Sequence, residues 1–414
     1  MKIVDVTEFY SERGGGIRSH LTVRGHFLCQ LGHEHVVMAP GPRNEDAPVN
    51  EDAPVGSQVV ASGGVPSRLV RFAGPTQPYD RTYHLLGCID KVRTQILREQ
   101  ADVLEAHSPY LAAAAILGSG RHASRIRTAF WHSDHIGSYA QPTLDRWLGP
   151  RHARVATAPL WQAMRALLLP FDAVFVAGRA QAERLRRAGV RDVVHVPFGV
   201  DIRTFHPGAR VESERAKWLE GAGEGAALLV GVGRFAVDKR WDVVLDAFAR
   251  LRATRPCVLV LFGDGPERGR LEARASPGVH FAGFEQDRSK LARSLASADV
   301  LVHASPYETF GLGVAEAVAC GLPIVVPQSG GAAESATPEC SEVYSDLDVP
   351  ECAASIERLL VRDRGELRVR AIDAASRVPS IDKHFATVLG SYAELLREHA
   401  GRRAYARPGG RNFQ

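Results

Sequence analysis

Apolar runs and amphipathic segments alternate along the second half of the chain. Runs this uniformly apolar are typical of strands buried on both faces, and the segments between them have helical spacing. Alternation of strand and helix predicts a parallel sheet with right-handed crossovers, which is a doubly wound α/β domain. The predicted strands are 227–235, 257–263, 279–284, 299–304 and 323–327, and the predicted helices are 241–251, one from about 267, 288–297 and 311–319.

The first half repeats this alternation less regularly. Its predicted strands are 2–6, 34–39, 102–106, 127–131, 173–177 and 193–196, with a helix from about Ile17. The fold class is therefore α/β, with two doubly wound, Rossmann-like domains at 1–198 and 208–384 and a linker at 197–207. Ligands of such sheets bind beyond the carboxyl ends of the strands, so two facing domains predict a cleft between those ends.

Composition fits a folded protein and disfavours several kinds of site. The chain has 414 residues, of which 45% are apolar and 24% charged, as expected of two soluble domains. No apolar run is long enough to span a membrane and the N-terminus lacks a secretory pattern, so we expect a cytoplasmic protein. The net charge of +4 comes with clustered Arg, which favours contact with phosphate or an anionic surface over nucleic acid.

Three further features are interpreted as having no chemistry. The six cysteines are scattered without a CxxC pair, which indicates reduced thiols and no zinc site. The tandem NEDAPV repeat at 44–55 is interpreted as a flexible loop. The basic, Gly-rich tail at 402–414 is predicted to be disordered.

Two cations stand at the end of the second domain's first predicted strand. Arg234 and Lys239 flank one loop there, and this arrangement suits a diphosphate. Arg can grip two oxygens at once, and Lys adds a point charge. A solvated loop is the alternative interpretation.

Two carboxylates surround the next candidate site. Glu308 follows the predicted strand 299–304, and Glu316 lies eight positions later, within the helix. The helix N-terminus lies between them, and its free amides can bind phosphate. Glu308 and Glu316 could then reach two parts of one ligand, a sugar and a ribose. The backbone of this N-terminus comes from Phe310, Gly311, Leu312 and Gly313.

The first half has weaker candidates at its strand ends. Gly15 and Gly16 belong to a glycine-rich turn, where the backbone can approach a ligand closely at a helix N-terminus. The spacing is not GxGxxG, so a dinucleotide site is only weakly supported. His107 and His132 end two successive strands, and a neutral imidazole oriented by Asp134 could donate to a sugar hydroxyl. Either His could instead be structural.

These motifs together resemble the retaining GT-B glycosyltransferases of family GT4, over nearly the whole chain. The most specific match is the glutamate pair within SPYETFGLGVAEAVACGLPIVV. The segments GRFAVDK, GDGPER, GVDIRTFHP and the glycine-rich turn match as well. FYSERGGGIRSH is similar in particular to phosphatidylinositol mannosyltransferases, although Tyr307 stands where a His would precede the glutamate.

The resemblance implies roles for the candidate residues. Arg234 and Lys239 would bind the donor's diphosphate, and Glu316 the ribose hydroxyls. Glu308 would hold the transferred sugar and its phosphate, together with the backbone of Phe310, Gly311 and Leu312. His132 would lie beside the sugar, and Gly15 and Gly16 would approach the donor or acceptor across the cleft. A last helix at about 385–400 would cross back onto the first domain.

The expected reaction is transfer of a hexose from a nucleotide sugar to a hydroxyl acceptor, lipid-linked or a small glycoside. GDP-mannose is the favoured donor. No DxD-like pair stands at a strand end, so we expect neither a metal nor a cofactor; cations and helix amides would stabilise the leaving diphosphate. The alternatives are a UDP-hexose transferase with a soluble acceptor, a GT-B epimerase, and a non-catalytic sugar-nucleotide binder.

Two segments of the first domain combine basic and apolar residues. Residues 146–169 carry four arginines beside Trp147, Trp161 and a Leu-rich end, and 67–72 adds a second patch. Cations with Trp and Leu on a helix suit the interface of an anionic membrane, which predicts peripheral contact with the inner face of the cell membrane. The alternative is a core helix, because Pro150 and Pro159 would interrupt a long amphipathic run.

Overall fold

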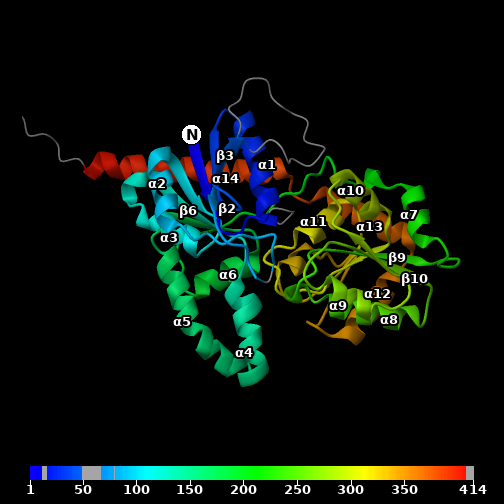
Figure 1. Cartoon of the computed structure of the whole chain (residues 1–414). Helices are drawn as coiled ribbons and strands as arrows, with labels where there is room; N and C mark the ends of the chain where they lie inside the picture. Colours follow the sequence, from blue (N-terminus) through cyan, green and yellow to red (C-terminus); the bar gives the residue numbers. More distant parts are fainter. Residues whose placement is uncertain (12–15, 49–66, 79, 407–414) are drawn as a thin grey trace, which may run out of the picture.

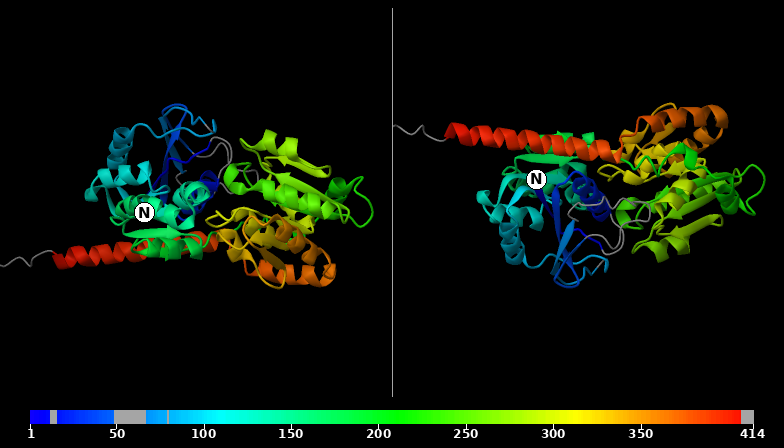
Figure 2. Two further views of the ribbon diagram at one scale, coloured as in Figure 1. Left: turned by 90° about the horizontal axis from the view of Figure 1, so that it is seen from below. Right: turned by 90° about the horizontal axis from the view of Figure 1, so that it is seen from above.

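The computed structural model describes residues 1–11, 16–48, 67–78 and 80–406, with side chains as far as Gly401. Two α/β domains lie side by side, and helix α14 (Ile381–Ala406) runs from the second domain along the first (Figures 1 and 2). The predicted α/β fold with two doubly wound domains is confirmed.

The first domain is built on a sheet with the strand order β3-β4-β2-β1-β5-β6-β7-β8. Neighbouring strands are parallel except for β3 and β4, which form an antiparallel edge. The strands are β1 Lys2–Val6, β2 Glu34–Gly41, β3 Glu45–Pro48, β4 Arg68–Ala73, β5 Ala101–Ala106, β6 Ser124–Trp131, β7 Ala173–Val176 and β8 Val193–His195. The helices are α1 Gly16–Gln30, α2 Ile89–Glu99, α3 Leu111–Gly118, α4 Gln141–Leu148, α5 Pro150–Leu168 and α6 Arg179–Arg187.

The polar edge of this sheet corrects two predictions. The first copy of the NEDAPV repeat, interpreted as loop, contributes strand β3, whereas the second copy lies outside the described residues. The patch at 67–72, interpreted as a membrane contact, is mostly strand β4, in which Leu69, Val70 and Phe72 are buried beside β2. Their side chains belong to the core and are not available to a membrane.

The second domain has an all-parallel sheet with the order β11-β10-β9-β12-β13-β14. Its strands are β9 Ala227–Val232, β10 Cys257–Phe262, β11 Val279–Gly283, β12 Val300–Val302, β13 Ile324–Pro327 and β14 Ser341–Tyr344. Its helices are α7 Glu212–Leu219, α8 Trp241–Arg252, α9 Arg268–Arg274, α10 Arg288–Ser297, α11 Leu312–Ala319, α12 Val349–Leu360 and α13 Arg364–Ser376. Only β14 had no counterpart among the strands predicted for this half.

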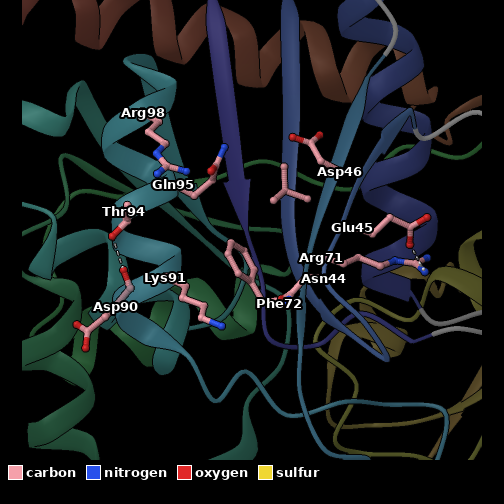
Figure 3. A pocket seen from close by; sticks show the side chains of 11 residues that line it. Asn44, Glu45, Asp46, Arg71, Phe72, Asp90, Lys91, Thr94, Gln95 and Arg98 are labelled. Atoms are coloured by element: carbon pink, nitrogen blue, oxygen red, sulfur yellow. Dashed lines mark hydrogen bonds and ion pairs between the residues drawn. The ribbon is translucent and has the colours of Figure 1, made fainter.

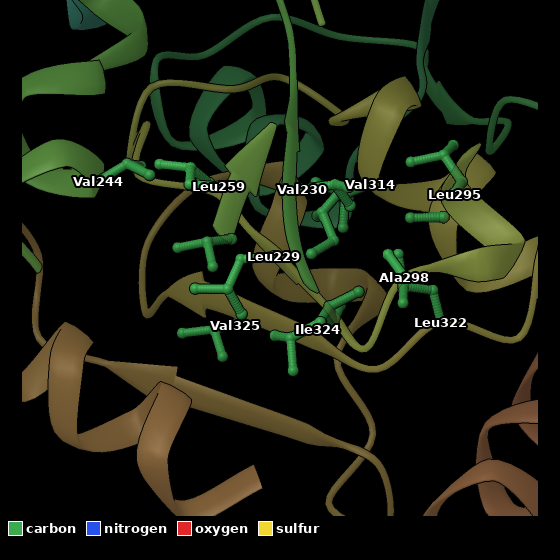
Figure 4. Packing of buried hydrophobic residues seen from close by; sticks show 14 of the residues in the cluster. Leu229, Val230, Val244, Leu259, Leu295, Ala298, Val314, Leu322, Ile324 and Val325 are labelled. Carbon is green, nitrogen blue, oxygen red and sulfur yellow. The ribbon is translucent and has the colours of Figure 1, made fainter. Parts of the chain in front are cut away.

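Apolar side chains fill both faces of the second sheet. Successive residues of β9, Leu229 and Val230, point to opposite faces, toward Val244 of α8 and Val314 of α11 (Figure 4). All four are almost fully buried, and burying each stabilises the fold by roughly 1.5–3 kcal/mol. The helices on both faces therefore hold the strand ends, and the loops that follow them, in fixed positions.

Helix α14, the last described helix of the chain, packs against the sheet of the first domain. Val388, Tyr392 and Leu396 are buried in one cluster with Ile3 and Phe175 of the first sheet. The helix continues to Ala406, so the prediction of disorder is wrong for 402–406, and 407–414 lie outside the described residues.

The strand orders define where a ligand can bind. In the second sheet, β9 lies between β10 and β12, so the chain leaves β9 toward one side and β12 toward the other. In the first sheet, β1 lies in the same way between β2 and β5. Ligands of open α/β sheets bind in the crevice at such switch points.

Candidate active site

The loop at the switch point of the second sheet contacts the first domain at the end of β6. The loop after β12 reaches the end of β6, where the Thr309 hydroxyl donates to the backbone oxygen of His132 at 2.6 Å. Beside it, the Ser138 hydroxyl donates to the backbone oxygen of Tyr307 at 3.3 Å. His132 and Glu308, predicted from different halves of the chain, therefore lie on two loops in direct contact.

Lys239 and Glu308 form an ion pair at the switch point of the second sheet. The Lys239 Nζ lies 2.7 Å from Glu308 Oε1 and 3.4 Å from an oxygen of Asp238. Burial acts to raise the pKa of Glu308, but the Lys239 ammonium holds that pKa below its ordinary value. Burial likewise opposes the charge on Lys239, yet Glu308 and Asp238 raise the Lys239 pKa. Both side chains are therefore charged at neutral pH.

His303 lies beside Glu308 of this ion pair and was not predicted as a site residue. Its Nε2 lies 3.7 Å from Glu308 Oε1, and burial lowers the His303 pKa to about 4. A neutral imidazole thus packs against the carboxylate. The available signal was its position directly after β12, in the loop that carries Glu308.

Arg234 connects the two domains. Its guanidinium lies 3.0 Å from a carboxylate oxygen of Asp80 and over the ring of Tyr83, 5.5 Å from the centroid. Asp80 and Tyr83 come from the segment before α2 in the first domain. The Arg234 Nε is buried, and its N–H has no acceptor among the described residues.

The N-terminus of α11 lies beside the ion pair. Gly311 has a φ of +84°, which lets the chain turn into the helix at a residue without a side chain. Among the described residues, no side chain caps the first turn, which leaves the amides near Leu312 to an anion. Phe310 packs edge-on against Phe198 of the first domain, with ring centroids 5.3 Å apart.

Glu316 is buried on α11 and paired with Arg288, the first residue of α10. Burial raises the pKa of Glu316, while Arg288 acts to lower it. The Arg288 guanidinium also lies over the Phe205 ring, 4.7 Å from its centroid. Sequence reasoning missed Arg288. This residue directly follows Asp287, which caps α10 at the end of the loop after β11. Any ribose bound by Glu316 would share that carboxylate with Arg288.

His132 is held by His107 rather than by Asp134. The His107 Nδ1 lies 2.7 Å from His132 Nε2. Asp134, predicted to orient His132, instead accepts from the Gly137 amide and lies 3.0 Å from Arg184. Burial holds the pKa of His132 well below its ordinary value, so this imidazole is neutral at pH 7.

The glycine-rich turn is only partly described. Gly16 is the first residue of α1, and Gly15 lies outside the described residues. A hollow of about 600 Å³ lies elsewhere, between α2 and the β3–β4 edge, and Lys91 and Arg98 line it with Asp46 (Figure 3). It is on the flank of the first domain, away from Arg234 and Glu308, and is not the predicted donor site.

Two groups of side chains in the described part could hold a metal ion. They are His20 with His107 and His132, and Asp5 with Glu105 and His107. Two nitrogen ligands of a tetrahedral zinc ion would lie about 3.3 Å apart, given Zn–N distances near 2.0–2.1 Å. The 2.7 Å between His107 and His132 fits a hydrogen bond better.

Comparison with known proteins identifies the family. Residues 14–204 match the family described as Glycosyltransferase Family 4, and residues 226–362 match Glycosyl transferases group 1. The GDP-mannose-dependent alpha-(1-6)-phosphatidylinositol dimannoside mannosyltransferase of Mycobacterium tuberculosis is 33% identical over 87% of this chain and 88% of its own length. This chain belongs to glycosyltransferase family 4. The predicted resemblance is therefore confirmed.

Other relatives and solved structures extend this result to the fold. A GDP-mannose-dependent alpha-mannosyltransferase of Mycolicibacterium smegmatis is 30% identical over 88% of this family 4 chain and 90% of its own length. Sucrose-phosphate synthase from Thermosynechococcus elongatus superposes with a TM-score of 0.74 at 19% identity, covering 96% of this chain and all of that one. The family 4 glycosyltransferase described here thus has the GT-B fold. None of its described helices is both long and apolar enough to cross a lipid bilayer.

Proposed function

We propose that this glycosyltransferase transfers mannose from GDP-mannose to a hydroxyl of a lipid-linked acceptor, with retention and without a metal. The observation that carries the proposal is the meeting of Arg234, Lys239 and the α11 N-terminus at one switch point. Two cations and free helix amides can stabilise the negative charge of a diphosphate, which in other enzymes is stabilised by a divalent metal. GDP-mannose is taken from the names of the relatives that share most of the chain.

The proposed chemistry uses the leaving group itself. The acceptor hydroxyl attacks C1 of mannose from the face on which the bond to the diphosphate breaks. The new C1–O bond forms on that face, which retains the configuration, and the hydroxyl proton passes to the departing GDP. Arg234 and Lys239 would stabilise the charge that develops on the diphosphate, and Glu308 would hold the sugar. No protein nucleophile is required.

A helical hairpin supports a membrane-associated acceptor. Helices α4 and α5, joined at Gly149, extend away from the first sheet (Figure 1). Helix α4 has no buried residue; Trp147 is 83% exposed at its end and Val155 of α5 is 74% exposed. The hairpin follows β6, the strand that ends at the domain interface. The expected interruption at Pro150 is confirmed, because α4 ends before it and α5 begins there. Pro159 lies inside α5 without ending it, so the expected interruption at Pro159 is wrong.

We therefore place the peripheral contact with an anionic membrane on this hairpin. Arg146, Arg151 and Arg154 lie beside the exposed apolar residues in the sequence of the hairpin. Cations would attract anionic headgroups while Trp147 and Val155 enter the interface. A lipid-linked acceptor would then be presented close to the end of β6.

The decisive experiment is a transfer assay with matched donors and acceptors. Thermal shift with GDP-mannose, GDP-glucose, UDP-glucose and UDP-galactose identifies the donor, because a bound ligand raises the melting temperature by mass action. Transfer is then measured to phosphatidylinositol mannosides and to a soluble α-mannoside, with NMR of the anomeric proton and with EDTA in parallel. The proposal expects an α-linked product from GDP-mannose on the lipid that is unaffected by EDTA. Exclusive use of a UDP-hexose, release of free sugar alone, or an inverted product would contradict it.

A further inference from the structure

A cluster of charges is buried beneath the end of the first sheet. Asp5 and Glu105 are directly opposite each other on the neighbouring strands β1 and β5, and both are fully buried. Arg24 of α1 lies between them, with Nε 3.1 Å from Asp5 Oδ2 and one terminal nitrogen 2.5 Å from Glu105 Oε1. Two carboxylates against one guanidinium leave these three residues with one excess negative charge. Such a charge is costly to bury unless hydrogen bonds satisfy it.

Most of the carboxylate oxygens have donors. Glu105 Oε2 accepts from the Thr128 hydroxyl at 2.7 Å and from the Tyr392 hydroxyl of α14 at 2.6 Å. Asp5 Oδ2 lies 2.7 Å from Nε2 of His35, whose other nitrogen lies 2.6 Å from the Ser67 hydroxyl. Burial lowers the pKa of His35, which keeps that imidazole neutral.

Asp5 and His107 each have one buried polar atom without a hydrogen bond among the described residues. Asp5 Oδ1 and His107 Nε2 are buried and have no hydrogen bond of good geometry in the described part of the chain, yet they lie 3.2 Å apart. The same His107 nitrogen lies 3.4 Å from Glu105 Oε1. An N–H at this nitrogen would face the two negatively charged carboxylates, which attract it, whereas a lone pair there would be repelled by both of them. The surroundings therefore select the Nε2–H form of His107.

The tautomer of His107 determines the tautomer of His132. When Nε2 of a neutral His107 carries the hydrogen, Nδ1 is the acceptor, and it lies 2.7 Å from His132 Nε2. His132 must then carry its hydrogen on Nε2, which leaves His132 Nδ1 as a lone pair. His132 is also the residue whose backbone oxygen is bonded to Thr309, next to Glu308.

We propose that His107 is a positioning residue that, held by Asp5, fixes His132 in the tautomer that accepts a hydroxyl hydrogen of the transferred sugar. This rests on the proposed function, in which His132 lies beside that sugar. The sequence alone suggested a donating imidazole, and the buried carboxylates reverse the direction of the hydrogen bond. Fixing the tautomer in advance means that no proton has to move when the sugar binds.

The test is the tautomer of His132, read from two-bond ¹H–¹⁵N spectra of the histidine side chains. The His132 signal is assigned by its loss in His132→Gln. We expect the Nε2–H tautomer in the wild-type protein at pH 7.5 and a mixture of tautomers in His107→Leu. His107→Gln should restore the wild-type state, because an amide can donate to Asp5 and accept from His132. His35→Leu is the matched control, since it also removes a buried imidazole from Asp5 but does not contact His132.

Kinetics give a second readout. Hydrogen-bond partners of metal-bound imidazoles are worth roughly 10–100-fold in activity. We expect an effect of the same order for the partner of His132, so His107→Leu should lower kcat by about that factor with a donor KM within about twofold. His107→Gln should recover most of the loss, and His35→Leu should keep kcat. If His107→Leu does not fold, the wild-type and His107→Gln spectra still decide the tautomer.

Several results would overturn the inference. They are a wild-type His132 in the Nδ1–H or imidazolium form, an equal loss of kcat in His35→Leu, and stoichiometric zinc bound at the imidazoles. Failure of the proposed function is a separate result. If the protein turns over no GDP-mannose, or only a UDP-hexose, the wild-type spectrum still tests the relation between His107 and His132.

Discussion

Lys239 and Glu308 hold each other in their charged forms through an ion pair of 2.7 Å at the switch point of the second sheet. They were expected to contact different parts of the donor, the diphosphate and the sugar. Their pairing means that a donor binding to either residue also changes the surroundings of the other. In the proposed function, recognition of the diphosphate and recognition of the sugar are therefore coupled through this one ion pair.

Lys239→Ala should lower kcat by about 10²–10³-fold, with a smaller effect on acceptor KM. The loss of a preorganised group that stabilises transition-state charge has this size. Glu308 would also lose the ammonium that keeps its pKa below the ordinary value. Steady-state kinetics check this, with Lys91→Ala on the exposed surface of α2 as the control. A kcat within twofold of wild type would remove Lys239 from the diphosphate site.

Asp80→Asn should tighten donor binding by up to about fivefold. The Asp80 carboxylate lies 3.0 Å from Arg234 and, in the proposed function, would compete with a phosphate for that guanidinium. Such partly exposed pairs contribute about 0–1 kcal/mol. Asn retains the oxygen that accepts from Thr82, so the local turn is kept. Calorimetry with GDP-mannose measures the change, and Asp90→Asn is the control; weaker binding would show that Asp80 assists the donor.

Glu316→Gln should weaken donor binding by roughly 10–150-fold, the equivalent of about 1.5–3 kcal/mol for a hydrogen bond to a charged group. Glu316→Ala is a less clean test, because the structure pairs this carboxylate with Arg288. Removing it leaves Arg288 unpaired and should also lower stability, which sequence reasoning did not anticipate. Calorimetry and urea unfolding of both variants separate the two effects. Equal donor affinity in Glu316→Gln and wild type would exclude a ribose contact.

The folded chain should lose stability as the pH falls from about 6.5 to about 4. Burial lowers the pKa of His303 and of His384 to about 4. Between about pH 6.5 and 4 these two residues are therefore protonated in the unfolded chain but remain neutral in the folded chain. Each residue then removes up to about 3 kcal/mol of stability across it. Urea unfolding between pH 7 and 5 should show a shallower pH dependence for His384→Gln, which keeps a donor for Pro197. Identical pH dependence in variant and wild type would refute this.

Liposome binding should depend on the α4–α5 hairpin. Trp147→Ser with Val155→Ser should reduce co-sedimentation with vesicles containing anionic lipid, because both side chains are exposed and apolar. Val369→Ser is the control, since Val369 is 68% exposed on α13 of the second domain. Binding should also fall with salt. Wild-type protein that does not bind at low salt would move the acceptor from a membrane to solution.

The sequence was most informative where strands are buried on both faces. The apolar runs of β9, β10 and β13 are typical of buried strands when helical segments alternate with them. Their positions also indicate which residues follow a strand end. Strands β3 and β14 were not predicted, because their short sequences, EDAP and SEVY, are polar or mixed and pair only at a sheet edge. Strand β4 was also missed, because its mixture of Arg and apolar residues was interpreted as a membrane patch. Their conformation comes from their neighbours in space.

Side-chain pairing was the main part that the sequence did not reveal. Arg288 reaches Glu316 because α10 packs beside α11, and His107 reaches His132 because β5 and β6 are adjacent. In neither pair do the two residues belong to the same helix or strand, so no spacing along the sequence connects them. Asp134 seemed suited to orient His132 because it is close in sequence, yet its carboxylate turns toward Arg184.

The contact between Tyr392 and Glu105 has a consequence for the order of events during synthesis. The two residues are 287 positions apart, and the Tyr392 hydroxyl supplies both Glu105 and Arg24 with a buried partner. Until α14 has left the ribosome, the nascent first sheet lacks the Tyr392 hydroxyl, which is one of the hydrogen-bond partners of these buried charges. The contacts between the first sheet and α14 can therefore form only after the second domain has been made.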